Sequence, residues 1–225
     1  YQGFKELQVL FQKRLSTVAS GFEARRRALK TELEQAPVSG AGQLLHDLVS
    51  RDISSLQEVL DTVEPESIER AAEMLETAET VYLVGQLRSA PVVLLLRYQL
   101  TMLGKPCVLL DESGGLATHR ARLAGSGDLI FAVSFRSYAH EVVTITEEAA
   151  DRGVPVLAIS DSTLSPLAKS ADLLFTVPER QYTFSRSLAA PMCLSQGIVV
   201  ALAARLSQDE APRIPTVTQP LEKKP

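Results

Sequence analysis

Two short polar loops in this chain contain the residue types that hold a phosphate group. They are Gly85-Gln86-Leu87-Arg88-Ser89 and Ser134-Phe135-Arg136-Ser137-Tyr138. Each loop follows an apolar run typical of a buried strand and precedes a helical pattern. Such a turn from strand to helix brings hydroxyls, a guanidinium group and unbonded backbone N–H groups to one place, where they can bind phosphate oxygens. Two such loops in one parallel sheet predict a pocket for a phosphorylated small molecule.

Several groups of these loops are candidates for direct contact with the ligand. Ser89 and Ser134 could donate hydrogen bonds from their hydroxyls to phosphate oxygens. Ser89 could instead simply cap the helix that follows it. The candidate ligand-binding residues of the two loops are Gly85, Gln86, Arg88, Ser89, Ser134, Arg136, Ser137 and Tyr138.

The two arginines and the tyrosine have alternative roles. Arg88 and Arg136 could bind an anion through paired hydrogen bonds. They could equally form surface salt bridges, with Glu112 or Glu141 as partners. Tyr138 could stack on the ligand or pack against neighbouring side chains. The sequence alone leaves each of these alternatives open.

The composition fits one large domain with an extension and contains no sign of a membrane anchor. The chain has 225 residues, of which 45% are hydrophobic. Its nearest approach to a membrane span, Pro91 to Leu96, ends at Arg97, whereas a spanning helix needs about 20 apolar residues. We therefore expect a cytoplasmic protein without a membrane contact. Because the chain begins with Tyr1 and shows no signal peptide, we expect a fragment of a longer protein.

The cysteines and histidines do not predict a metal site or a cofactor. Cys107 and Cys193 form no CxxC pair and stand in apolar surroundings. We expect them to be buried thiols in a reducing compartment. The chain has three histidines, and they are not clustered with other metal ligands.

The charge is distributed unevenly along the chain. Residues 1–30 contain seven Lys or Arg and two Glu, a balance of +5, so that the rest of the chain must carry −9 for the total of −4. A basic arm on an acidic body could contact a polyanion. It could also be the solvated face of a helix, which is the interpretation that we favour.

The pattern of apolar residues predicts helices first and then alternating strands and helices. The expected early helices cover residues 4–35, 44–60 and a segment from residue 65, with a linker over residues 36–42. The expected strands are residues 81–84, 106–110, 128–133, 154–159 and 173–177, and the helices between and after them are residues 89–103, 116–123, 139–152, 165–168 and 188–206. Continuous apolar strands separated by helices indicate a three-layer α/β/α fold, flavodoxin-like, with a five-stranded parallel sheet preceded by α-helices. Ligands of such sheets lie beyond the carboxyl ends of the strands, where both polar loops are found.

Three segments of the chain resemble the sugar isomerase (SIS) domain. The first two are the strand–loop units that end in Ser89 and Glu141. The third is Ser160-Asp161-Ser162-Thr163-Leu164-Ser165-Pro166-Leu167-Ala168, followed by Ala171-Asp172, and it is the most specific. The resemblance covers residues 65–207. It implies that Ser187, at the start of the last helix, also borders the ligand site.

The start of the chain resembles a narrower group, the RpiR-type transcriptional regulators. Tyr1-Gln2-Gly3-Phe4-Lys5-Glu6-Leu7 is similar to the end of their helix-turn-helix domain, and residues 44–80 are similar to the helices that lead into their SIS domain. We expect residues 1–40 to be the end of a DNA-binding domain and a helical linker, residues 41–207 the SIS ligand-binding domain with its helical lead-in, and residues 208–225 a flexible tail.

Both loops depart from the usual SIS pattern. Leu87 stands where the first loop usually has a second glycine. In the second loop, Arg136, Ser137 and Ala139 replace the usual Ser, Gly and Thr. The loss of glycine limits the close approach of the backbone to a phosphate, whereas the two arginines add positive charge. The ligand can therefore be anionic without being an ordinary sugar phosphate.

The resemblance implies a sensor rather than an enzyme. We expect the ligand-sensing and dimerisation domain of a bacterial DNA-binding transcriptional regulator, a homodimer or homotetramer that binds a phosphorylated sugar or a similar anionic metabolite and contacts DNA through its missing domain. The expected dimer surfaces are the apolar faces of residues 4–35 and 188–206. One alternative is a sugar-phosphate aldose–ketose isomerase that uses His140 and Glu141. Another is a dimerisation module with a vestigial pocket.

Overall fold

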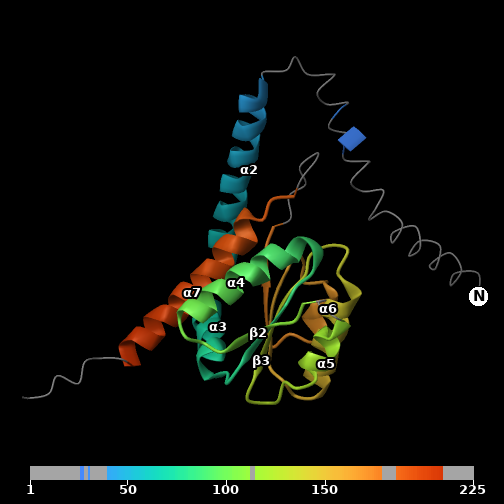
Figure 1. The fold of residues 1–225 in the computed structure, drawn as a ribbon. Coiled ribbons are helices and arrows are strands. Elements are labelled where there is room, and N and C mark those ends of the chain that lie inside the picture. Colours follow the sequence, from blue (N-terminus) through green and yellow to red (C-terminus); the bar gives the residue numbers. More distant parts are fainter. Residues whose placement is uncertain (1–25, 28–29, 31–39, 112–114, 179–185, 210–225) are drawn as a thin grey trace, which may run out of the picture.

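The computed structural model describes residues 26–27, 30, 40–111, 115–178 and 186–209 (Figure 1). Its strands are β1 (Val81–Val84), β2 (Cys107–Leu109), β3 (Leu129–Val133), β4 (Val156–Ser160) and β5 (Leu173–Thr176). Its helices are α2 (Gly40–Thr62), α3 (Pro65–Thr77), α4 (Ala90–Met102), α5 (Ala117–Ala121), α6 (His140–Asp151) and α7 (Ala189–Asp209), with the short 3-10 helices η1 (Leu87–Ser89) and η3 (Pro166–Lys169).

The five strands form one parallel sheet in the order β2-β1-β3-β4-β5. Every residue of β3 and β4 is buried, as expected for central strands that are covered by helices on both faces. The predicted flavodoxin-like α/β/α fold with a five-stranded parallel sheet is confirmed. From β1 the chain adds β2 on one side of the sheet and then β3, β4 and β5 on the other. The order therefore switches between β1 and β3, and sheets of this kind bind their ligands at such a switch point.

Alternate side chains of each strand enter two separate cores. Phe131 and Ile159 belong to the larger core, which lies under α3, α4 and α7. Ile130 and Ala158 belong to the smaller core, which lies under α5 and α6. Figure 1 shows α4 and α7 on one side of the sheet and α5 and α6 on the other. The two-residue period of the strands thus divides the apolar residues between the two layers of helices.

The ends of several helices follow from residues recognised in the sequence. Pro65 occupies the first turn of α3, where its missing N–H costs no hydrogen bond. Gly104 and Gly153 end α4 and α6 with φ values of +72° and +75°, which glycine adopts without steric penalty. The element boundaries otherwise agree with the predicted ones to within two residues from β1 to the start of α7.

Some expectations are corrected or lie outside the described residues. Most of the helix predicted over residues 4–35 lies outside the described residues. So does most of the tail predicted over residues 208–225, but its first two residues belong to α7, which continues to Asp209. α2 begins at Gly40, inside the predicted linker. Cys193 is exposed rather than buried, because it lies on the side of α7 that faces away from the core.

α7 is long and apolar enough to cross a membrane, judged by length and composition alone, although the sequence led us to expect no such helix. In this structure it packs against α2, α3 and α4. Leu194, Ile198 and Leu202 are buried in the larger core. Packing within the domain therefore accounts for the apolar residues on one side of α7, while its opposite side remains exposed.

Candidate functional site

The two polar loops lie side by side because β1 and β3 are neighbours in the sheet. Val84 pairs with Ala132 in the parallel register, so that both strands end at the same edge. Gly85 lies close to the end of β3. A Cβ atom built on Gly85 would lie 2.8 Å from Cγ1 of Val93 and 3.1 Å from the carbonyl oxygen of Val133. Gly85 therefore allows the first loop to pass close to the end of β3.

The first loop turns into η1 and then into α4. Leu87 has a φ of +53°, in the left-handed region that side chains usually avoid. Ser89 is only 3% exposed and occupies the N-cap position of α4, but its side chain makes no capping hydrogen bond. Ser89 therefore occupies the cap position without capping the helix through its hydroxyl.

Arg88 connects three segments that are distant in the sequence. Its guanidinium carbon lies 4.7 Å from the centre of the Phe135 ring, and Nη1 donates a hydrogen bond of 3.4 Å to the carbonyl oxygen of Ser187. The Ser187 hydroxyl in turn accepts a hydrogen bond of 3.0 Å from the backbone N–H of Ala189, at the start of α7. The predicted residue Ser187 thus lies beside the first loop, with its hydroxyl engaged at the helix end.

The second loop is held by its neighbour β4. Ser134 is 3% exposed, and its carbonyl oxygen accepts a hydrogen bond of 2.7 Å from the hydroxyl of Ser160. Ser137 has a φ of +83°, so this loop also contains a residue other than glycine in the left-handed region. Arg136, next to it, is exposed. The loop therefore offers a buried serine and an exposed guanidinium group at one edge of the sheet.

Tyr138 is half-buried, and its hydroxyl is bonded to Asp161, directly after β4. Burial, together with a hydrogen bond to the carboxylate of Asp161, raises the pKa of Tyr138 to about 12. Arg186 approaches the same place. Burial, and then the charge of Arg136, lower the pKa of Arg186, while the charge of Asp161 acts in the opposite direction.

Sequence reasoning did not assign Asp161, Arg186 and Phe135 to the site, although each stands in or next to a segment that resembles the SIS domain. The signal that could have found Asp161 was its position two residues after the strand predicted over residues 154–159, close to the criterion that selected the two loops. Phe135 is buried beneath Arg88, where its ring orients the guanidinium group.

Gln86 and Glu141 are hydrogen-bonded to each other. Nε2 of Gln86 donates a hydrogen bond of 2.5 Å to the Glu141 carboxylate, which also accepts one of 3.2 Å from the hydroxyl of Thr118. His140 is exposed, with Nδ1 lying 3.3 Å from the hydroxyl of Thr144 on its own helix. The described residues contain no group of three or more His, Cys, Asp or Glu that could hold a metal ion.

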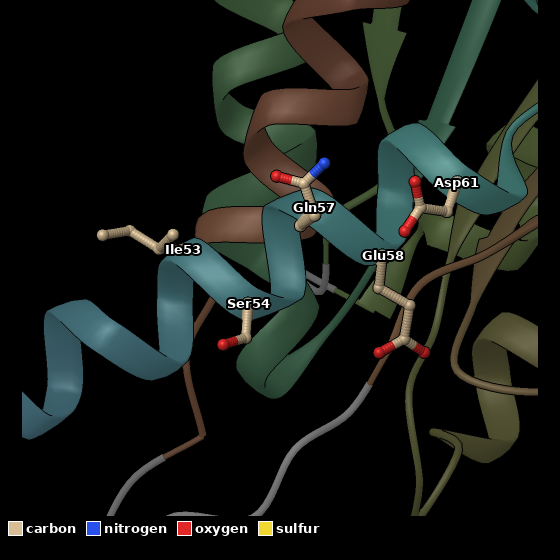
Figure 2. A pocket seen from close by; sticks show the side chains of 5 residues that line it. All are labelled: Ile53, Ser54, Gln57, Glu58 and Asp61. Carbon is tan, nitrogen blue, oxygen red and sulfur yellow. The ribbon is translucent and has the colours of Figure 1, made fainter.

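A hollow of about 390 Å³ also lies beside α2 (Figure 2). Its walls are formed by Ile53, Ser54, Gln57, Glu58 and Asp61. All five side chains come from one helix, none comes from a strand end, and two are acidic. A phosphate would be repelled there, so the hollow does not compete with the loops as an anion site.

The profile of the SIS domain matches residues 74–204, which is more than half of the chain. The chain belongs to the SIS domain family. Within that family it is of the RpiR type, because it is 31% identical to the sugar isomerase domain of the RpiR transcription factor from Sphaerobacter thermophilus. That comparison covers 74% of this chain and 93% of the other, with a TM-score of 0.70.

Other relatives of this SIS domain are also transcriptional regulators. The regulator HexR from Pseudomonas aeruginosa is 26% identical over 67% of this chain and 56% of its own length. The NanR protein of Vibrio vulnificus, solved in complex with ManNAc-6P, shares the fold with a TM-score of 0.67 at 24% identity, covering 82% of this chain and 69% of the other. The chain spans about half the length of the curated relatives that it matches.

Phosphosugar isomerases have the same fold. Phosphoheptose isomerase GmhA from Neisseria gonorrhoeae is 16% identical with a TM-score of 0.63, over 72% of this chain and 98% of the other. At such an identity the likeness concerns the fold alone, so the residues of the site must distinguish a sensor from an enzyme.

Proposed function

We propose that this SIS domain is the ligand-sensing and dimerisation part of a bacterial, cytoplasmic, DNA-binding transcriptional regulator and is not an enzyme. Its ligand is a phosphorylated sugar or a related anionic carbohydrate derivative. The observation that carries the proposal is the convergence of Ser89, Ser134 and Arg88 at the ends of β1 and β3. Two hydroxyls and an oriented guanidinium group match the hydrogen-bonding needs of a phosphate monoester.

The relatives support this function and its partners. They are named HTH-type transcriptional regulators, and NanR is described as a complex with a phosphorylated amino sugar. DNA would be contacted by a helix-turn-helix domain that precedes Tyr1 in the whole protein. Ser137, Arg136 and Arg186 would meet the rest of the ligand at the second loop.

The bonds of Arg88 provide a route from the ligand to the rest of the protein. Arg88 stands just before α4, and its hydrogen bond to Ser187 reaches the start of α7. A phosphate that attracts the guanidinium group would alter this contact and so change how α4 and α7 sit together. The ligand can shift the regulator between two states only by binding one of them more tightly.

A thermal-shift screen with phosphorylated sugars, including ManNAc-6P, tests the proposal. A binding sugar phosphate should raise the melting temperature of this chain, and its dephosphorylated form should not. Arg136→Ala should reduce the shift because it removes one positive charge beside the second loop. If no sugar phosphate or other anionic metabolite changes the melting temperature, the sensing function is wrong and a dimerisation module remains.

The isomerase alternative is less well supported by the described site. An isomerase needs an acid and a base that reach the substrate carbon. The Glu141 carboxylate accepts two hydrogen bonds from Gln86 and Thr118, and His140 lies exposed on α6. Assays with pentose and hexose phosphates should therefore show no aldose–ketose turnover. Turnover that disappears in Glu141→Ala or His140→Ala would reverse this conclusion.

A further inference from the structure

Three arginines that are distant in the sequence come together beside the two loops. Arg88 lies over the Phe135 ring, with its guanidinium carbon 4.7 Å from the ring centre, and its Nη1 donates a hydrogen bond of 3.4 Å to the carbonyl oxygen of Ser187. Arg136 directly follows Phe135 in the chain. Arg186 directly precedes Ser187. Since the Cα atoms of bonded neighbours are only about 3.8 Å apart, the contacts of Arg88 bring all three arginines to the same edge of the sheet.

The carboxylate of Asp161 lies beside the second loop and is already engaged by two hydroxyl groups. Oγ of Ser160 lies 3.4 Å from Oδ1 of Asp161, and the same hydroxyl donates a hydrogen bond of 2.7 Å to the carbonyl oxygen of Ser134. The hydroxyl of Tyr138 is also hydrogen-bonded to Asp161. Asp161 is therefore fixed next to the loop, and its oxygens are shared with groups other than arginine.

The second loop thus combines two guanidinium groups with one carboxylate, which leaves one positive charge in excess among these three side chains. Burial lowers the pKa of Arg186, and the charge of Arg136 lowers it further, while the charge of Asp161 acts in the opposite direction. The two arginines are therefore close enough to repel each other. Nε of Arg186 is buried, so that water screens an anion beside it less than on the open surface.

We infer that the ligand carries a carboxylate in addition to its phosphate, and is therefore a phosphorylated sugar acid; the inference rests on the proposed sensing function. The phosphate lies at Ser89, Ser134 and Arg88, and the carboxylate lies between Arg136 and Arg186. A guanidinium group binds a carboxylate through two parallel N–H···O hydrogen bonds. The single negative charge of a carboxylate balances the excess at the second loop, whereas a second phosphate would add about two.

The residue at position 136 supports a charged rather than a neutral group at this end of the ligand. The usual second loop of the SIS pattern has a serine where this chain has Arg136. A serine hydroxyl can donate to a phosphate or to a sugar hydroxyl, but it adds no charge. A site built to bond a particular group rejects an analogue that lacks it, because the groups of the site then lose their partner. The two arginines should therefore distinguish an acid from the corresponding alcohol.

Isothermal titration of the unsubstituted chain with matched ligands tests the inference. 6-Phosphogluconate and sorbitol 6-phosphate differ only in having a carboxylate or an alcohol at C1, and 5-phosphoribonate and ribitol 5-phosphate form a second such pair. In at least one pair the acid should bind about tenfold or more tightly than the alcohol. Glucosamine 6-phosphate, which carries an ammonium group, should bind more weakly than glucose 6-phosphate.

Substitutions assign the discrimination to the two arginines. Arg136→Gln and Arg186→Gln should each weaken binding of the acid about tenfold or more and binding of the alcohol less than about threefold. Ser89→Ala should weaken both by the same factor, because both ligands carry the phosphate. Arg97→Gln removes an exposed arginine from α4 and should change neither affinity.

The possible outcomes separate this inference from the sensing function. Equal affinities for acid and alcohol in both pairs, or tighter binding of glucosamine 6-phosphate than of glucose 6-phosphate, would overturn the inference and leave the sensing function in place. These comparisons use the unsubstituted chain, so they do not depend on how the variants fold. Arginine variants that lose acid and alcohol to the same degree would also overturn it. If no phosphorylated sugar of either kind binds, the inference and the sensing function are both wrong.

Discussion

Leu87 and Ser137 both have a positive φ, +53° and +83°, although Leu87 is the third residue after β1 and Ser137 the fourth residue after β3. Among the described residues, they are the positions other than glycine with a positive φ. Glycine adopts this conformation freely, whereas a Cβ atom makes it unfavourable by about 1–2 kcal/mol. In both loops the backbone therefore has a positive φ, as glycine often does, at a position where the usual SIS pattern has glycine.

Replacing these residues by glycine should stabilise the domain. We expect Leu87→Gly and Ser137→Gly each to raise the free energy of unfolding by up to about 1 kcal/mol, because relief of the left-handed strain exceeds the added freedom of the unfolded chain. This corresponds to about 2–4 °C in melting temperature. Ser170, with a φ of −107°, offers a matched control: Ser170→Gly should not stabilise. Lower melting temperatures for both loop variants would show that their conformations carry no strain.

Gly85 should tolerate no larger side chain. In Gly85→Ala the new methyl group would lie 2.8 Å from the Val93 side chain and 3.1 Å from the backbone of Val133. We expect a loss of about 1–3 kcal/mol in unfolding free energy, measured by urea denaturation.

Gly42→Ala is the control for the preceding substitution. Gly42 lies in α2, and a Cβ atom there would meet nothing within 4 Å. Its replacement should therefore leave stability unchanged or raise it by up to about 1 kcal/mol. Equal effects of the two alanines would mean that the loops are not closely packed.

The buried serines should matter for ligand binding more than for folding. Ser89→Ala and Ser134→Ala should each weaken binding of a sugar phosphate about tenfold or more, since a hydrogen bond to a charged group contributes about 1.5–3 kcal/mol. Isothermal titration with a sugar phosphate found in the screen measures the loss.

Ser165 provides the control for these two serines. Its hydroxyl is buried without a hydrogen-bond partner in the described structure, so that Ser165→Ala should not destabilise the domain. The affinity for the ligand should also be retained. Equal loss of affinity in all three alanine variants would indicate a general effect of packing near the sheet edge.

Tyr138 should make the domain sensitive to alkaline pH. Its pKa in the folded state is raised to about 12, mainly by burial and then by Asp161, from an ordinary value of 10. The unfolded state therefore loses this proton first, and the stability contributed by the neutral phenol is lost as the pH rises from about 10 to about 12. Urea denaturation at pH 9 and pH 11 should show a smaller loss for Tyr138→Phe. The same loss in both proteins would mean that other groups control the alkaline transition.

Local patterns in the sequence were enough to predict the fold and to select the two candidate loops. The apolar strands and the glycines at 104 and 153 set the elements, because burial on both faces and left-handed helix ends leave clear local patterns. The polar loops after β1 and β3 were recognisable for the same reason, since each follows its strand directly. Family resemblance then indicated that Ser187, distant in the sequence, belongs with them.

The contacts between the side chains of the site came from the tertiary structure. Gln86 is held by Glu141, Tyr138 by Asp161, and Arg88 by Phe135 and Ser187. These pairs depend on the order of the strands and on where α7 begins. Which apolar residues of α4 and α7 face the core, and which stay exposed, was also decided by how the helices pack. An apolar residue has the same pattern whether it faces the core of its own chain or a surface that another chain can cover.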